Sequence, residues 1–336
     1  MLTKIVVPEI SIIVPVYNVE KYLERCLDSI FNQKFSGSFE VISVEDYSTD
    51  NSLEVLKEYQ KRFPELIIIE HEVNKKLAQA RTTGMKVAQG AYIMHVDSDD
   101  WLLPNALESV YLKCLESGAD VLVYNYLIEN EKGEQVFLNK IKEETVTSDK
   151  LKVQNHFFGA CWTKIVKREL IEDMVYFNAI TLNTEDLIYC SEILLRANKI
   201  HLLPQDFYAY FKNSQSITNS TNPQKYLNNQ IVILTILDKI CVRYNPNNAF
   251  QSNLLDYFEK WIYLELCKTH FWNKEDVAIC KPIFEELFNI QLLDKVRVGR
   301  LRISINNKYK NLFEIIKRFG LRLTLGILYR SFRKNK

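Results

Sequence analysis

The sequence predicts an α/β fold with a mainly parallel sheet, helices on both faces of the sheet, and a helical C-terminal region. Two observations support this prediction. Over roughly the first 130 residues, short apolar runs rich in β-branched residues alternate with segments of helical period. Beyond about residue 222 only the helical period continues. We therefore expect one domain over 1–217 and a helical region over 218–336, which ends in a basic tail at 295–336.

These patterns place the elements of the first domain in order. Buried-strand runs are expected at 10–17, 39–46, 66–71, 91–97 and 119–128. Helix-period segments are expected between them, at 20–33, 53–63, 76–89 and 104–118. The capping residues "STDNS" precede the second helix, and Pro104 suits the first turn of the fourth. Alternating strands and helices build parallel sheets that bind ligands at the carboxyl ends of the strands, so we expect a site there.

The composition is that of an ordinary globular protein. Apolar residues make up 47% and charged residues 25% of the 336 residues. No uncharged apolar run is long enough to span a bilayer, and Pro8 and Glu9 interrupt the first apolar stretch, so we expect no signal peptide. The seven cysteines stand singly, which predicts free thiols in a reducing cytoplasm.

The net charge of +1 conceals an acidic body and a basic tail. Residues 295–336 contain thirteen of the 43 Lys and Arg residues but one of the 42 acidic residues. The tail is also apolar and of helical period, which favours contact with an anionic membrane surface. Packing on the acidic body and a dimer interface are the alternatives. No nucleic-acid-binding motif accompanies the charge.

The most informative motif is "AYIMHVDSDDW" at 91–101, an apolar strand that runs into Asp97, Asp99 and Asp100. Like charges at this spacing repel, so the cluster indicates a bound cation. Carboxylates suit Mg²⁺ or Mn²⁺, and Asp97 and Asp99 could share one ion while leaving positions for phosphates. An EF-hand is excluded because Trp101 stands where that loop needs a ligand. Capping of the next helix would account for one acid but not for three.

Two other strand ends carry residues suited to a nucleobase. Asp46 follows the second strand and could accept a hydrogen bond from a base edge, or it could be a plain turn residue. Tyr17 ends the first strand and could stack on a base, although an ordinary connection explains it better when it is taken alone. The neighbouring Asp97–Asp99 motif favours the nucleotide interpretation of Asp46.

A nucleotide site also needs groups that bind phosphates. The chain has nine glycines and no G-x-G, so the dinucleotide-binding fingerprint and the Walker A loop are both absent. A diphosphate would depend on the metal and on basic residues of "VNKKLAQARTTG", namely Lys75, Lys76 or Arg81. A solvated helix start is the other interpretation of these lysines.

Glu185 and Asp186 precede a helical stretch in "NTEDLIY". A carboxylate in a cleft can act as a general base toward a hydroxyl group. An acidic pair is also favoured at a helix N-terminus, and the residues alone favour that second interpretation. His95 lies inside the fourth strand and is interpreted as a packed histidine. No Cys or His set has zinc spacing.

Taken together, these motifs resemble those of the family 2 glycosyltransferases of GT-A fold, which has a Rossmann-like sheet. The resemblance covers roughly residues 8–217. It rests on the order and spacing of "ISIIVPVYNVEKYLERCLDSIFNQ", "VEDYSTDNS", "VNKKLAQARTTG", "AYIMHVDSDDW", "CWTKIVKREL" and "TEDLIY". It implies an inverting, metal-dependent transfer of a sugar from a nucleotide donor, most often UDP-linked, in the synthesis of a bacterial surface polysaccharide.

The resemblance also implies a role for each matching residue. The nucleobase would be held by Pro15, Tyr17 and Asp46. Asp97 would lie near the ribose and the metal, and Asp99 would bind the Mn²⁺ or Mg²⁺ ion at the diphosphate. Asp186 would deprotonate the acceptor hydroxyl. The acceptor side would be lined by Trp162, Lys164 and Glu185.

This chain departs from the family pattern at two places. Tyr47 stands where the family commonly has the glycine of D-G-S-T-D, so a bulky side chain takes a position that tolerates positive φ. Lys75 and Lys76 replace the glycines of N-G-G, and they could grip the diphosphate or an acidic sugar.

We therefore expect a cytoplasmic transferase, peripheral to the inner face of the plasma membrane, that acts on a saccharide acceptor carried on a lipid. A homo-oligomer is left open. A sugar-phosphate nucleotidyltransferase is one alternative, but it needs a glycine-rich loop after the first strand, which this chain lacks. A catalytically impaired nucleotide-sugar-binding or scaffold protein is the other. Tyr47 keeps that alternative open, whereas Asp99 and Asp186 argue against it.

Overall fold

The computed structural model describes residues 7–137, 141, 143–147, 160–172, 174, 185–213 and 243. The chain divides into two compact units, Met1–Asn219 and Ser220–Lys336. Apart from residue 243, every described residue belongs to the first unit. The helical region expected over 218–336 and its basic tail lie outside the described residues, and both stay predictions.

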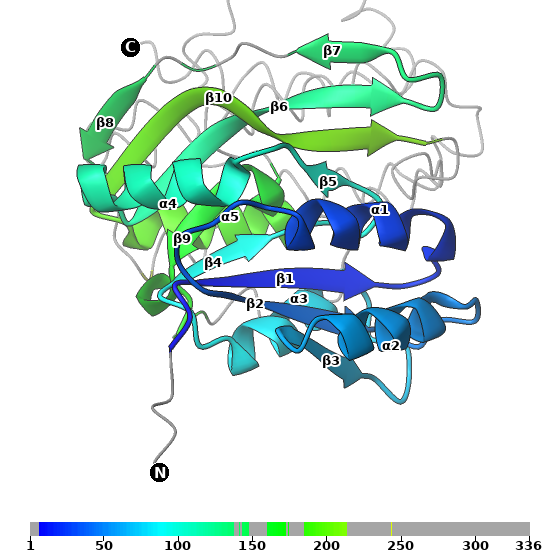
Figure 1. Ribbon diagram of the computed structural model, residues 1–336. Helices are drawn as coiled ribbons and strands as arrows, with labels where there is room; N and C mark the ends of the chain where they lie inside the picture. The colour runs from blue at the N-terminus through cyan, green and yellow to red at the C-terminus, as the bar shows by residue number, and fades with distance from the viewer. Residues whose placement is uncertain are drawn as a thin grey trace, which may run out of the picture. The chain divides into compact units, whose positions relative to one another are not determined.

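Within the described residues, a mixed sheet of ten strands forms the centre of the first unit (Figure 1). Its main path runs β3-β2-β1-β4-β9-β6-β10-β5, with β7 beside β6 and β8 beside β10. The strands are β1 Ile10–Val16, β2 Phe39–Glu45, β3 Leu66–Glu70, β4 Tyr92–His95, β5 Trp101–Leu102, β6 Val121–Asn130, β7 Gln135–Phe137, β8 Glu144–Thr147, β9 Lys164–Lys167 and β10 Lys199–Lys212. The helices are α1 Glu20–Phe31, α2 Ser52–Arg62, α3 Leu77–Val87, α4 Ala106–Ser117 and α5 Glu185–Arg196, with short 3₁₀ turns η2 Cys161–Thr163 and η3 Arg168–Leu170.

The α/β fold class is confirmed, and the pairing shows where the parallel pattern holds. Strands β1 to β4 pair in parallel, and so do β6 and β10. Strand β9 lies between β4 and β6 and runs antiparallel to both. Because β9 follows β6 in the chain, a later segment separates two strands that the sequence pattern would place side by side.

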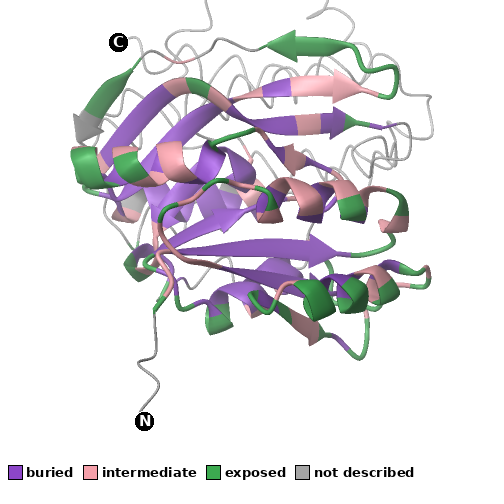
Figure 2. Ribbon diagram, viewed as in Figure 1, coloured by how far each residue is buried: buried purple, intermediate pink, exposed green. Residues whose placement is uncertain are grey.

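Helices cover both faces of the sheet, as the sequence predicts (Figure 1). The buried faces of α1, α2 and α4 share one apolar cluster with alternate residues of β1 and β4. Helix α3 packs on the opposite face so closely that a Cβ on Gly84 would lie 2.7 Å from Cγ2 of Ile13. Helix α5 meets the same face, where Tyr189 contacts His95, the sheet partner of Ile13. Figure 2 shows that the central strands of the sheet are buried, whereas β7 and the outer surfaces of the helices are exposed.

Two further expectations can be compared with the described residues. The four cysteines that the structure describes are free thiols, as expected, and all are buried: Cys26, Cys114, Cys161 and Cys190. None of the helices within the described ranges combines the length and the apolar character needed to cross a membrane.

The register of the sheet brings three of the predicted site residues toward one edge, namely Tyr17, Asp46 and Asp97. Val16 of β1 lies opposite Glu45 of β2, which lies opposite Glu70 of β3. The carboxyl ends of these parallel strands therefore coincide, and β4 ends beside them. The residues that follow each end share one region of the fold, where ligands bind in sheets of this kind.

Candidate active site

Arg81 of α3 joins the two predicted acidic motifs. Its side chain is fully buried. Its Nη2 donates to Oδ1 of Asp97 at 2.6 Å, while Nη1 donates to Oε1 of Glu185 at 2.5 Å and to Oδ1 of Asp186 at 3.1 Å. Two motifs that lie far apart in the sequence thus meet at one guanidinium. Because both of its amino groups are directed at protein carboxylates, direct contact of Arg81 with a donor stays a prediction.

The two acids at the start of α5 differ in exposure. The side chain of Glu185 is 3% exposed, whereas that of Asp186 is 33% exposed. Burial raises the pKa of Glu185 to about 7, and the charge of Arg81 opposes this shift. Asp186 also accepts the backbone N–H of Cys161 at 3.3 Å. Of the pair, Asp186 is the one that can present an oxygen to a bound substrate.

Residues 97–100 form a turn after β4, the aspartate turn, which places Asp97 and Asp99 close together. The N–H of Asp100 donates to the carbonyl of Asp97 at 3.0 Å and closes this turn. Burial, followed by the negative charge of Asp97, raises the pKa of Asp99 to about 6. Nδ2 of Asn213 donates to Oδ2 of Asp99 at 3.1 Å, and Arg25 donates to the backbone carbonyl of Asp99 at 3.0 Å. In the part of the chain that the structure describes, no basic side chain pairs with the Asp99 carboxylate.

These properties of Asp99 fit a divalent cation. An acid whose ionised form is disfavoured by burial and by a neighbouring acid gains from a positive charge beside it. Among the described residues, no three His, Cys, Asp or Glu side chains are grouped as metal ligands. Asp97 and Asp99 would therefore supply part of the coordination shell, as in sites where substrate phosphates complete it.

Asp100 has a different role from its two neighbours. It is fully buried. Its Oδ2 accepts the hydroxyl of Tyr208 at 2.7 Å, and its Oδ1 accepts the N–H of Phe211 at 2.7 Å. The Tyr208 hydroxyl in turn accepts the N–H of Asp97 at 3.0 Å. Both carboxylate oxygens are bound to β10, so Asp100 fastens the turn to the sheet instead of serving a metal.

Asp46 is buried after β2 and holds the segment before α3. Its Oδ1 accepts the N–H of Lys75 and its Oδ2 accepts the N–H of Lys76, both at 2.8 Å. Nδ1 of His71 lies 2.7 Å from the same Oδ1. Asp46 thus positions the loop that carries two exposed lysines. Its contact with a base edge stays a prediction and would use the remaining lone pairs.

The surface beside this loop is partly aromatic. Tyr17 is 43% exposed and Tyr47 is 54% exposed, each just beyond a strand end, while Pro15 is buried within β1. Tyr47 has φ of 64°, so it does hold the backbone conformation that the family glycine would favour. Lys76 has φ of 73° and ψ of 163°, also where the family has glycine. These geometries leave stacking of a base on Tyr17 as a prediction.

Trp162 and Lys164, expected on the acceptor side, lie inside the fold. They are 6% and 1% exposed. The Trp162 ring stacks on that of Tyr208 with centroids 4.5 Å apart and an interplanar angle of 11°. Nζ of Lys164 donates to the carbonyl of Ala160 at 3.2 Å. Their direct contact with an acceptor stays a prediction, whereas their support of the neighbouring backbone is visible.

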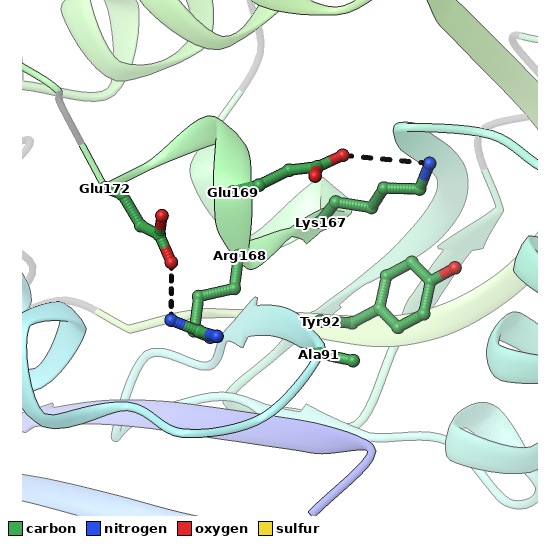
Figure 3. Close-up of a pocket in the computed structure, with 6 residues that line it drawn as sticks. All are labelled: Ala91, Tyr92, Lys167, Arg168, Glu169 and Glu172. Carbon is green, nitrogen blue, oxygen red and sulfur yellow. Dashed lines mark hydrogen bonds and ion pairs between the residues drawn. The ribbon is translucent and has the colours of Figure 1, made fainter.

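A pocket of about 320 Å³ opens elsewhere, at the amino end of β4 (Figure 3). Its walls come from the start of β4 and from the β9–η3 segment, namely Ala91, Tyr92, Lys167, Arg168, Glu169 and Glu172. Arg168 pairs with Glu172 at 2.5 Å, and Lys167 lies 3.9 Å from Glu169. Asp97 and Asp99 follow the carboxyl end of β4, whereas this pocket lies at its amino end, so the pocket is not part of the candidate site.

Several residues of the site carry no signal that sequence reasoning could use. Tyr208 lies within the long strand β10, and Asn213 follows that strand directly. Arg25 lies on α1, where its guanidinium stacks on Trp101 at 3.8 Å. His71 stands alone after β3. Their roles depend on contacts between distant segments, and no local spacing indicates them.

Comparison with known proteins shows the family and the fold. The model of the family described as "Glycosyl transferase family 2" matches residues 11–175. Glycosyltransferase GlyG of Streptococcus pneumoniae is 30% identical over 220 residues, which span 62% of this chain and 72% of that protein. Glycosyltransferase GlyA of the same organism is 33% identical over 214 residues, 60% of this chain, but the match spans just 30% of GlyA.

A solved structure has the same fold. The crystal structure of Staphylococcus aureus TarS, residues 1–349, in complex with UDP-GlcNAc has a TM-score of 0.72 to this chain. The alignment covers 98% of this chain and 92% of that one, at 21% identity. TarS is a poly(ribitol-phosphate) beta-N-acetylglucosaminyltransferase. It is 30% identical to this chain over 205 residues, which span 60% of this chain and 35% of TarS.

Proposed function

Because this chain belongs to glycosyl transferase family 2, we propose that it transfers a sugar from a nucleotide-sugar donor to a saccharide acceptor in the synthesis of a bacterial surface polysaccharide. The observation that carries the proposal is the Arg81 network. It holds the expected donor-side acid Asp97 and the expected base Asp186 on one guanidinium. The general base and the donor must be held at a fixed separation for the acceptor hydroxyl to attack the donor sugar in a single step.

The proposed reaction is a single displacement. The acceptor hydroxyl oxygen forms a bond to the anomeric carbon while the bond from that carbon to the diphosphate oxygen breaks. The hydroxyl proton passes to Asp186, and the nucleoside diphosphate leaves. Attack on the face opposite the leaving group inverts the configuration. Asp186 is suited to this role because its side chain is one-third exposed, whereas that of Glu185 is buried.

We propose a UDP-linked donor. The bound UDP-GlcNAc of TarS, a protein of the same fold, supports this choice. Pro15, Tyr17 and Asp46 lie at the strand ends where the base would bind. The exposed side chains of Lys75 and Lys76, on the loop that Asp46 fixes, would face the negative diphosphate or an acidic sugar.

We further propose a dependence on Mn²⁺ or Mg²⁺. The ion would be held by Asp99 and Asp97 and would stabilise the negative charge of the leaving diphosphate. Binding of the ion would relieve the unfavourable burial of Asp99 beside Asp97. The residues that carry this proposal are those of the aspartate turn.

The acceptor and the location in the cell are proposals drawn from the sequence. A lipid-linked saccharide acceptor and peripheral attachment to the inner face of the plasma membrane would suit the basic tail at 295–336. Trp162, Lys164 and Glu185 would shape the acceptor side. A homo-oligomer is compatible with the same tail acting as an interface.

The second candidate is a nucleotide-sugar-binding protein with impaired catalysis. Tyr47 favours it, because a bulky residue with φ of 64° stands beside the expected base site. The intact pair of Asp99 and Asp186 favours the enzyme. A binding protein would retain UDP-sugar affinity without turnover.

The test is release of nucleoside diphosphate from UDP-, GDP- and dTDP-sugars, with membrane extract as the source of acceptor. Each donor is assayed with and without Mn²⁺ or Mg²⁺, on the wild type and on Asp99→Asn. We expect metal-dependent release from one donor and its loss in the variant. Equal activity of the variant would contradict the metal assignment. Tight donor binding without turnover would favour the binding protein.

A further inference from the structure

Asp97 and Asp186, the two acids that Arg81 connects, are also linked by a second series of contacts between neighbouring residues. On the first path, Arg81 contacts both Asp97 and Asp186 directly. On the second path, Asp186 accepts the N–H of Cys161, which adjoins Trp162 in η2. Trp162 stacks on Tyr208, whose hydroxyl accepts the N–H of Asp97. The two paths close a ring of contacts.

The second path is rigid because each member has further partners. The Trp162 ring also stacks on Tyr210, with centroids 5.5 Å apart, and meets Tyr126 edge-on at 4.7 Å. The carbonyl of Trp162 accepts the hydroxyl of Tyr124 at 2.7 Å. Tyr208 is fully buried. Aromatic pairs have preferred geometries, so a displacement of the Trp162 ring would disturb several favourable contacts at once.

The hydroxyl of Tyr208 is the one polar contact that connects this aromatic group to the aspartate turn within the described residues. It accepts a hydrogen bond from Asp97 and donates one to Asp100. Replacing the hydroxyl by hydrogen would leave the N–H of Asp97 and one oxygen of Asp100 without these partners, while the ring could still stack on Trp162.

We propose that Tyr208 is a positioning residue that, together with Trp162, sets the separation between the general base Asp186 and the aspartate turn. This inference rests on the proposed function, since it concerns the same reaction. Tyr208 touches neither donor nor acceptor in this account. It acts through the backbone of Asp97 on one side and through the backbone beside Asp186 on the other.

The inference makes a kinetic prediction. A small displacement between a base and the reacting carbon lowers the rate of the chemical step by up to ~100-fold, because the near-attack geometry is lost. In the proposed function, the nucleobase is held by other residues, at the ends of β1 and β2, whereas the aspartate turn meets the donor through the metal and the diphosphate. Loss of the Tyr208 hydroxyl should therefore lower kcat by a larger factor than it raises the donor KM.

The experiment compares Tyr208→Phe with Tyr59→Phe. Tyr59 is a matched control because it is also a buried tyrosine, 5% exposed, whose hydroxyl donates to an aspartate, Asp28, at 2.7 Å. It lies on α2, and its hydroxyl contacts α1, at the carbonyl of Glu24 and the carboxylate of Asp28. Calorimetric titration with UDP gives the number of binding sites in each preparation. Dividing kcat by that number removes any effect of unfolded protein.

We expect kcat per UDP site to fall by about 10- to 100-fold in Tyr208→Phe and to stay at the wild-type value in Tyr59→Phe. If Tyr208→Phe does not fold, Trp162→Phe, which shortens the stack, decides the question in the same assay. Wild-type kcat per site in the folded variant, or an equal loss in Tyr59→Phe, would overturn the positioning inference alone. A wild-type protein that binds UDP but turns over no donor would overturn the proposed function and this inference with it.

Discussion

Replacing Arg81 by methionine should destabilise the protein strongly, because it leaves buried acids without their cation. Glu185 has a side chain that is 3% exposed, and Arg81 lies 2.5 Å from it. Removing one partner of such a buried pair costs about 3–5 kcal/mol, since the remaining charge stays in a medium of low polarity. Methionine fills a similar volume, so the loss of packing adds little.

The pH dependence of this loss follows from Glu185. Its folded pKa is already raised to about 7 by burial, and without Arg81 it must rise further, because that charge opposes the shift. Above the unfolded value of about 4.3, the unfolded chain binds fewer protons than the folded one, so stability falls as pH rises. The cost of Arg81→Met should therefore be larger at pH 8 than at pH 5.

Urea unfolding followed by circular dichroism measures this effect. Arg168→Met is the matched control, because Arg168 also lies 2.5 Å from a glutamate, Glu172, but these side chains are 39% and 53% exposed. Pairs at the surface contribute up to ~1 kcal/mol. Adding Glu185→Gln to Arg81→Met should recover part of the loss at pH 8. A cost of Arg81→Met no larger than that of Arg168→Met would refute the reasoning.

Two other substitutions test the buried and strained positions. His95 is 1% exposed, neither ring nitrogen has a hydrogen-bond partner among the described residues, and burial lowers its pKa well below 6.5. His95→Leu should gain stability over the wild type by about 1.4 kcal/mol for each pH unit below ~6.5, because the unfolded histidine binds a proton that the folded one excludes. A stability difference that does not change between pH 7 and pH 5 would contradict this account. Lys76→Gly should stabilise by about 1 kcal/mol, since φ of 73° with ψ of 163° suits glycine. Lys76→Ala should give no such gain in the same denaturation measurement. Equal gains in stability for Lys76→Gly and Lys76→Ala would contradict the inference that the Lys76 backbone is strained.

Much of this site could be predicted because its main residues follow strand ends. The apolar runs before Tyr17, Asp46 and Asp97 mark three parallel strands, and parallel strands bring their carboxyl ends to one edge. The stretch "ENEKGEQ" has the composition of a turn between strands, and it joins β6 to β7 as a hairpin. These features are local in the sequence, so local patterns predict them.

The remaining features depend on contacts between distant segments. The local sequence of β9 does not indicate that it lies between β4 and β6. Its position follows from its pairing with these two strands, which are distant from it in the sequence. Asp100 belongs to the acidic cluster in the sequence, but the sequence does not show that both of its carboxylate oxygens bind distant residues, Tyr208 and Phe211. Trp162 and Lys164 match a motif, but the motif does not tell whether their side chains face a substrate or the core.

The central claim is that Asp186 is the base of a sugar transfer. The most direct measurement is the rate of transfer by Asp186→Asn with the donor that the wild type uses, with UDP binding measured in parallel. Glu172→Gln, at the other end of β4, is the control. We predict a loss of at least ~100-fold in kcat for Asp186→Asn with UDP binding retained, and no loss for the control. Transfer by Asp186→Asn at the wild-type rate would contradict the claim.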